Sequence, residues 1–273
     1  MKPSYLWILT LLALLAWLPP AAQADISVEG GLTYEKTSRP GEQYQGVIML
    51  KNQAEAPREI KIYQTDYRFD CEGKTTYGEP GTTPRSNARW MTFSPGRVII
   101  PPKEKASITY TIAVPADESL RGTYWSMLMV EVIPEKSPEA SGPEKTRQPS
   151  LGIIQVMRYA VQIITHVGDT GSREVKFLQT KVSRENGARI LQVDVENTGE
   201  RLVRPQVWTE LFGGDGASLG RFPGEQYRLY PGTSRRFSID ITSIPAGTYK
   251  TLVVADCGAD DLFGITYTLK LEH

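Results

Sequence analysis

Histidine and cysteine are scarce in this chain, which has only two of each among its 273 residues. Since His166 and His273 are the only histidines, neither a histidine-based zinc site nor a Ser-His-Asp triad is indicated. Cys71 and Cys257 do not form a C-x-x-C pair, so neither a zinc ribbon nor a redox motif is indicated. No P-loop or dinucleotide-binding fingerprint occurs. We therefore expect a protein that is not an enzyme and carries no cofactor or metal.

A net charge is also lacking, because 31 lysines and arginines balance 31 aspartates and glutamates. The sequence thus gives no reason to expect nucleic acid or anionic lipid as a partner, and no small-molecule substrate is indicated. Hydrophobic residues make up 40% of the chain and charged residues 23%, as in ordinary globular proteins. The length suggests two domains of about 100–150 residues each.

The first 24 residues are typical of a signal peptide. Lys2 precedes an apolar run from Tyr5 to Leu18, and Ala22-Gln23-Ala24 matches a cleavage site that would place Asp25 first in the mature chain. An uncleaved membrane anchor is the alternative, although a spanning helix needs about 20 apolar residues. We expect export to the periplasm, with secretion as the alternative location.

The rest of the chain reads as short strands separated by turn residues, without helical periodicity. The strands are predicted at Ile26–Tyr34, Tyr44–Lys51, Glu59–Tyr67, Arg97–Ile100, Ala106–Val114, Thr123–Ile133, Leu151–Val167, Glu174–Ser183, Ala188–Val195, Gln206–Phe212, Gly224–Leu229, Ser234–Ile241, Thr248–Asp256 and Ile265–Leu271. About seven strands per half are typical of an immunoglobulin-like sandwich. The expected fold is all-β, with two such domains in tandem at 25–167 and 168–273.

An internal repeat supports two similar domains. Asn52 and Asn197 follow corresponding strands, and each can close the next turn with its side chain. Tyr124 and Tyr249 both follow a Gly-Thr pair at the start of the penultimate strand. Immunoglobulin-like domains often place a tyrosine there whose hydroxyl binds nearby backbone, so we assign these tyrosines to the fold.

The segment 151–167 combines two patterns. From Met157 to Val167 it alternates apolar and polar residues, as expected for a strand with one buried face. Ile154 and Val156 make its first half apolar on both faces. The repeat makes this segment the last strand (strand G) of the first domain, preceded by a long F–G loop at 134–150. The alternative is that 137–150 is an interdomain linker.

The region Val114–Glu135, with Trp125 and the pair Ile133-Pro134, resembles the periplasmic pilus (fimbrial) chaperones of the PapD-like family. The segment Ala88–Ile112 is similar to the family's P-x-x-x-x-L-x-P-G stretch and the strand that follows. The resemblance implies two immunoglobulin-like domains set in an L. It also implies that strand G of the first domain is donated to an incomplete pilus or surface-fibre subunit, by β-strand addition.

Carried over to this chain, the resemblance implies that the donated face consists of Leu151, Ile153, Gln155 and Met157. Two basic residues of the family hold the subunit's terminal carboxylate in the interdomain cleft. Counting from Ile153 places one of them at Arg158, whereas alignment from the end of the strand places Gln162 there. The partner would be a secreted subunit, with an outer-membrane usher as a further candidate.

Three alternatives stay open from the sequence alone. Strand G could simply close the sheet of a secreted structural or adhesive module. An interdomain disulfide is the hypothesis for Cys71 and Cys257, since each is expected at the pole of its domain that faces the other; free thiols are the alternative. Charged groups on the second domain are interpreted as solvated turns and strand faces rather than as calcium or ligand sites. They comprise Asp256, Asp260, Asp261, Arg201, Arg204, Arg235 and Arg236.

Overall fold

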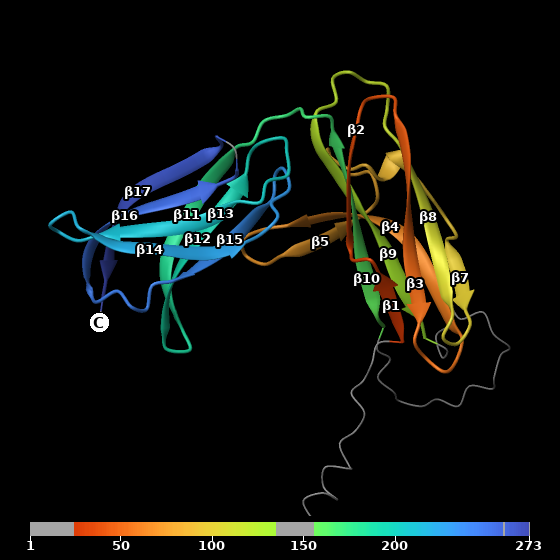
Figure 1. Cartoon of the computed structure of the whole chain (residues 1–273), viewed down its shortest axis with the longest axis horizontal. Helices are drawn as coiled ribbons and strands as arrows, with labels where there is room; N and C mark the ends of the chain where they lie inside the picture. Colours follow the sequence, from red (N-terminus) through yellow and green to blue (C-terminus); the bar gives the residue numbers. More distant parts are fainter. Residues whose placement is uncertain (1–24, 135–155, 259, 273) are drawn as a thin grey trace, which may run out of the picture.

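The computed structural model describes residues 25–134, 156–258 and 260–272. Figure 1 shows two β-sandwiches joined at an angle. The elements are β1 (Ile26–Glu29), β2 (Thr33–Ser38), β3 (Gln43–Asn52), β4 (Arg58–Phe69), β5 (Thr75–Gly78), the short 3-10 helix η1 (Ala88–Trp90), β6 (Met91–Ser94), β7 (Arg97–Ile100), β8 (Lys105–Ala113), β9 (Gly122–Ile133), β10 (Arg158–Val167), β11 (Val175–Glu185), β12 (Ala188–Asn197), β13 (Gln206–Phe212), β14 (Ser218–Gln226), β15 (Ser234–Asp240), β16 (Gly247–Asp256) and β17 (Leu262–Leu271). The all-β, two-sandwich fold predicted from the sequence is confirmed.

The first sandwich packs two sheets face to face. One has the strand order β1-β3-β8-β6, and the other has the order β2-β10-β9-β4-β5 with β7 beside β4. Alternate side chains of each strand enter the core, as Ile108, Tyr110 and Ile112 of β8 do. From β10, Val161 and Ile163 enter the same core and are fully buried. The last strand of this sandwich therefore contributes to its stability.

The predicted strand Ile26–Tyr34 is in fact two strands in different sheets. β1 runs antiparallel to β3, whereas β2 runs parallel to β10. Gly30 and Gly31 lie between them with φ of 85° and 103°. These left-handed values are costly for residues with a side chain, so the glycine pair allows the chain to cross from one sheet to the other.

The second sandwich has the strand order β11-β12-β15-β14-β13-β16-β17. β14 connects its two halves, because it pairs with β13 over most of its length and with β15 only between Gly224 and Ile239. This strand begins at Ser218, six residues before the predicted start at Gly224. The ends of the element are thus less predictable than its presence.

The two asparagines of the repeat have the same role in both sandwiches. Asn52 Nδ2 donates to the carbonyls of Ala56 and Ile100, at 2.8 and 2.9 Å. Asn197 Nδ2 donates to the carbonyls of Arg201 and Leu229, at 2.7 and 2.9 Å. Each side chain thus satisfies buried backbone groups at a turn, as predicted.

The tyrosines of the repeat differ from each other. Tyr249 Oη donates to the Pro245 carbonyl at 3.0 Å, which confirms the expected tie to nearby backbone. The Tyr124 ring packs on Trp90 with ring centroids 4.5 Å apart.

Among the described residues, no helix is both long and apolar enough to cross a membrane.

Candidate functional site at the domain junction

One edge of β10 is covered over only part of its length. β9 pairs with the whole strand, from Arg158 to Val167, but pairing with β2 starts at Gln162. The Gln162 amide donates to the Leu32 carbonyl on the β2 side at 2.9 Å. Backbone groups alternate sides along a strand, so those of Ala160 also point toward that side. Within the described residues, Tyr159–Val161 pairs with β9 alone.

The structure tests only part of the predicted donor face. Leu151, Ile153 and Gln155 lie outside the described residues. Met157 precedes β10 with 39% of its surface exposed, and its carbonyl accepts a hydrogen bond from the Val132 amide at 3.1 Å. The predicted strand Leu151–Val167 is therefore described as a strand only from Arg158 onward.

Arg158 is not at the domain junction. Its guanidinium forms an exposed ion pair with Glu131, with 2.6 Å between Nε and Oε2. Gln162, four residues later and about 13 Å further along the strand at about 3.3 Å per residue, lines the junction instead. Alignment from the end of the strand thus identifies the junction residue, whereas counting from Ile153 does not.

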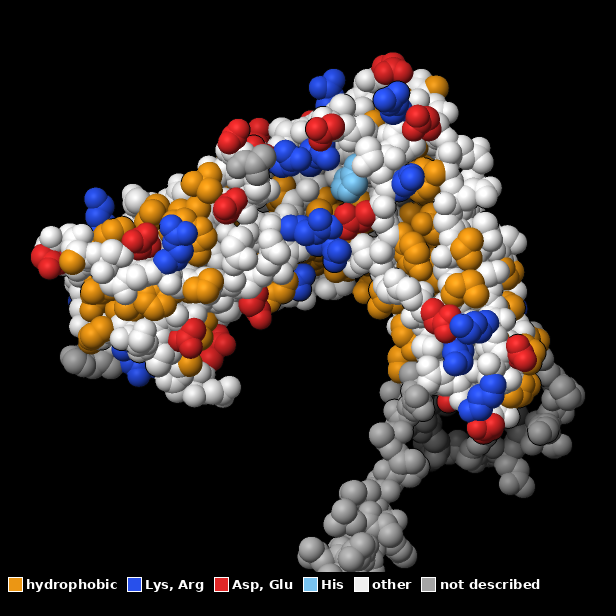
Figure 2. Space-filling view, in the orientation of Figure 1, with side chains coloured by type: hydrophobic (Ala, Val, Ile, Leu, Met, Phe, Trp, Pro, Cys, Tyr) orange, Lys and Arg blue, Asp and Glu red, His pale blue; other side chains and the backbone are white. Residues whose placement is uncertain are grey.

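A pocket of about 370 Å³ opens at the junction of the two sandwiches. We call it the junction pocket. Its walls combine aromatic rings with basic and amide side chains, and Figure 2 shows basic side chains gathered where the two sandwiches meet. The lining residues are Tyr67, Phe69, Gln162, Arg204, Gln226, Tyr227, Arg228, Tyr230 and Arg235.

A carboxylate from β2 joins two of the pocket arginines. Glu35 Oε1 accepts from the guanidiniums of Arg204 and Arg228, the latter at 3.2 Å. Its other oxygen lies 3.6 Å from His166 Nε2. Burial raises the pKa of Glu35, but the hydrogen bond and charge of Arg204, with the charges of Arg228 and His166, outweigh this and leave the pKa lowered. Glu35 is therefore held as a carboxylate.

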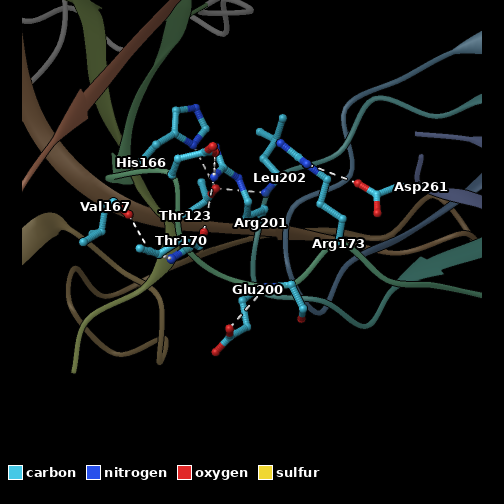
Figure 3. A network of polar contacts seen from close by, with 12 residues as sticks. Thr123, His166, Val167, Thr170, Arg173, Glu200, Arg201, Leu202 and Asp261 are labelled. Carbon is cyan, nitrogen blue, oxygen red and sulfur yellow. Dashed lines mark hydrogen bonds and ion pairs between the residues drawn. The ribbon is translucent and has the colours of Figure 1, made fainter. Parts of the chain in front are cut away.

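His166 links this cluster to the backbone at the junction (Figure 3). Its Nδ1 lies 2.9 Å from the Thr123 hydroxyl oxygen, which also accepts the Leu202 amide at 2.9 Å. Burial lowers the pKa of His166 below its ordinary value of 6.5, the charges of Arg201 and Arg204 act in the same direction, and Glu35 opposes them. The neutral imidazole is thus the form that the junction favours.

Acidification is expected to weaken the folded state through His166. Because its pKa is lower in the folded state, the unfolded chain binds the proton first, so stability present above pH 6.5 declines as pH falls below that value. Between pH 7.5 and 5, we expect His166 to contribute at most about 1.4 kcal/mol per pH unit to the slope of the unfolding free energy against pH. Urea unfolding at several pH values measures it. His166→Gln should flatten the curve, and an unchanged slope would assign it to other groups.

An apolar cluster also spans the two sandwiches. Trp125 and Ile164 of the first pack against Leu202 and Tyr230 of the second, and all are at least nine-tenths buried. The rings of Trp125 and Tyr230 stack with centroids 4.7 Å apart. Across the junction the Thr123 amide also donates to the Glu200 carbonyl at 2.8 Å. The sandwiches are therefore joined by a packed and hydrogen-bonded interface.

Comparisons with known proteins find no matching family model and no similar curated protein. Several solved structures are similar in fold. One, from work on a chaperone–tip adhesin complex in CFA/I fimbriae biogenesis, is 13% identical with a TM-score of 0.46, over 90% of this chain and 98% of that one. Another, the CsuC–CsuE chaperone–tip subunit pre-assembly complex of Acinetobacter baumannii Csu pili, is 16% identical with a TM-score of 0.44, over 89% and 98%. The YadV chaperone is 15% identical with a TM-score of 0.43, over 91% and 100%.

These structures include pilus chaperones. The similarity of this chain to them concerns the fold alone.

The predicted disulfide is absent, because Cys71 and Cys257 are both free thiols. Cys71 does lie against the second sandwich, where its amide donates to Ser234 Oγ of β15 at 3.0 Å. Cys257 follows β16, which is separated from β15 by β14 and β13. Burial, with the charges of Asp261 and Asp256, raises the pKa of the Cys257 thiol to about 11. The two cysteines therefore lie beside different strands of the second sandwich, and the hypothesis of an interdomain disulfide was wrong.

The arginines interpreted as solvated strand faces are mostly engaged at the junction or in ion pairs. Arg204 and Arg235 line the junction pocket. Arg201 pairs with Asp169, and Arg236 forms a two-pronged pair with the buried Asp194, at 2.7 Å for each contact. A sequence pattern could not have identified this, because the partners come from strands distant in sequence. No group of side chains suited to a metal ion occurs among the described residues.

The segment Gly216–Gly220 matches the G-x-S-x-G pattern of serine hydrolases, but its setting differs from that of a catalytic serine. In those enzymes the serine lies on a sharp turn from a strand to a helix. Ser218 instead begins β14, and its hydroxyl donates to Glu210 Oε1 at 2.6 Å across a hairpin. We assign this serine to the hairpin rather than to catalysis.

Proposed function

We propose that this protein is a periplasmic chaperone that binds incomplete pilus or surface-fibre subunits. The observation that carries the proposal is the edge of β10, where Tyr159–Val161 pairs with β9 alone in the described part of the chain. Such an edge can accept an added strand, with backbone hydrogen bonds supplying affinity. The residues expected to continue this edge toward the subunit are Leu151, Ile153, Gln155 and Met157, with Arg158 beside them.

The rigid setting of this edge supports the proposal. Val161 and Ile163 anchor β10 in the core, so the strand is ordered before any partner arrives. A strand that is already ordered loses less entropy on binding than a flexible segment. Exposed Val156 and Met157 directly precede the edge and offer apolar surface to a partner. The strand addition would need no nucleotide, and an outer-membrane usher is a further candidate partner.

The edge can be tested with a proline that removes one outward-pointing donor. Proline is tolerated in strands where its missing N–H would face away from the sheet. We expect Ala160→Pro to weaken capture of a co-expressed secreted subunit at least about tenfold, which corresponds to about 1.4 kcal/mol. Thermal stability should change little by comparison. Capture is measured by co-purification and by titration of the purified subunit.

Matched variants separate this result from a general loss of folding. Val161→Pro, one residue on, removes a donor on the β9 side and should lower stability strongly. Ile153→Asp should abolish capture at little cost in stability, whereas Val182→Asp on the edge strand β11 should not affect capture. Capture retained by Ala160→Pro and Ile153→Asp would favour a structural or adhesive module instead.

A further inference from the structure

The last strand of the chain, β17, is an open edge of the second sandwich. It pairs with β16 over its whole length and stands last in the strand order, and Figure 1 shows it along a border of that sandwich. At the start of this hairpin the Cys257 amide donates to the Asp261 carbonyl at 3.0 Å. Backbone groups alternate sides along a strand, so odd-numbered residues of β17 face β16 and even-numbered residues face outward. Gly264, Thr266 and Thr268 therefore direct backbone groups away from the sheet.

The opposite edge of this sandwich, β11, is protected against pairing with another strand. Its register with β12 shifts between Phe177 and Gln179, and its charged residues include the exposed Lys176 and Lys181. Bulges and charges are the means by which proteins blunt an edge strand. β17 pairs with β16 without any such shift, and Lys270 is the one charged residue in its sequence. Of the two edges, β17 is the one suited to pairing.

The side chains of β17 restrict what can pair with it. Leu262 is 62% exposed, more than any other large hydrophobic residue in the described part of the chain. Exposed charges of opposite sign lie at the two ends, with Asp260 just before the strand and Lys270 near its end. Asp261 is already paired with Arg173 at 3.1 Å. A strand with the reverse order of charges would complement this edge, and β17 itself has that order when it runs antiparallel.

We propose that β17 pairs with β17 of a second copy of this chain, in antiparallel orientation, to form a symmetric dimer. A twofold axis lets the same surface serve both copies. With the axis at Ile265, Gly264 lies opposite Thr266 of the second copy, so outward-facing backbone groups meet each other. Leu262 then lies opposite Thr268 of the second copy and is covered. The dimer joins two second sandwiches into one continuous sheet.

The charges select this register over its neighbours. In the proposed register Lys270 lies opposite Asp260 of the second copy, and symmetry repeats this pair. A shift in one direction would put Lys270 opposite Leu262 and bring Asp260 against Glu272. A shift in the other direction would put Lys270 opposite Gly258. Opposite charges directly across two strands stabilise their pairing, whereas like charges destabilise it.

Sedimentation equilibrium of the purified chain over a wide concentration range tests the dimer. We expect a monomer–dimer equilibrium, and Thr266→Pro should raise its dissociation constant at least about tenfold. This proline removes an outward-facing N–H, so the thermal stability of the diluted protein should change little. The matched control is Ala160→Pro on the edge of the first sandwich, which should dimerise normally. Thr266→Pro should in turn capture a subunit normally, so the dimer and subunit capture can fail separately.

Charge reversals test the register. Lys270→Asp and Asp260→Lys, each alone, put like charges opposite each other and should weaken the dimer at least about tenfold. The two changes combined restore opposite charges and should restore the dimer. Lys181→Asp on β11 changes the net charge equally and should have no effect. A chain that stays monomeric, a dimer unaffected by Thr266→Pro, or no restoration in the double variant would overturn the proposal.

Discussion

Replacement of Gly122 by alanine is expected to destabilise the junction more than most single substitutions in this protein. Gly122 has φ of +79°, and a Cβ atom there would lie 2.1 Å from the Glu200 carbonyl oxygen. The left-handed backbone costs a residue with a side chain about 1–2 kcal/mol, and a forced shift of packed atoms about 1–3 kcal/mol more. We therefore expect a loss of about 3 kcal/mol or more in unfolding free energy.

The atom that the new Cβ would meet is a backbone oxygen, so no change of side-chain rotamer can relieve the clash. The Glu200 carbonyl that would be displaced accepts the Thr123 amide at 2.8 Å, which is one of the hydrogen bonds that join the two sandwiches. Gly171 crowds the same position, since a Cβ atom on Gly171 would lie 2.7 Å from the Gly122 Cα. Alanine at 122 should thus open the junction as well as destabilise it.

Gly187→Ala is the matched control for this change. Gly187 has a similar φ of +85° but no atom within 4 Å of the added Cβ position. It should show the cost of the backbone conformation alone, about 1–2 kcal/mol. Denaturant unfolding measures both variants. Equal losses would show that the close approach to Glu200 contributes nothing.

The second large effect is expected for Trp125→Ala. The Trp125 side chain is 3% exposed, stacks on Tyr230 and donates from Nε1 to the Tyr67 carbonyl at 2.8 Å. Truncation of a buried tryptophan typically costs about 3–5 kcal/mol, and here it also leaves a buried carbonyl without its donor. Because the lost contacts join the two sandwiches, we expect their unfolding to become uncoupled.

Calorimetry can detect this as two transitions where the parent protein shows one. Trp208→Ala supplies a control, since Trp208 is half-buried on the second sandwich and contacts Arg221 rather than the first sandwich. It should lower stability less and leave one transition. Unchanged cooperativity in Trp125→Ala would show that the remaining contacts across the junction are sufficient to couple the two sandwiches.

These two contacts also fix the functional geometry. Tyr230 stacks on Trp125 and lines the junction pocket, and Gln162 of β10 accepts its hydroxyl. The open edge of β10 and the pocket therefore share one rigid support.

The sequence was sufficient to predict that the chain forms two sandwiches and to locate turns within each. Alternation of apolar residues predicted strands such as β8, and a nearly continuous apolar run predicted β9. The repeat located Asn52 and Asn197, and all these features depend on neighbours along the chain. It did not predict that Ile26–Tyr34 would divide between two sheets. Gly30-Gly31 was the available signal, since paired glycines permit the left-handed turn that the crossing requires.

The junction was decided by tertiary structure. Residues as distant in sequence as Glu35 and Arg228, or Trp125 and Tyr230, meet there, and no local periodicity encodes such pairs. Two of the arginines that looked like solvated strand faces, Arg204 and Arg235, line the junction pocket, and the two cysteines that looked like a pair lie beside different strands. By itself, the sequence determined most of the strands and the residues of each that face the core of its sandwich, because hydrophobic periodicity is a local property. How the two sandwiches meet depends on the packing of surfaces that are complete only after each has folded.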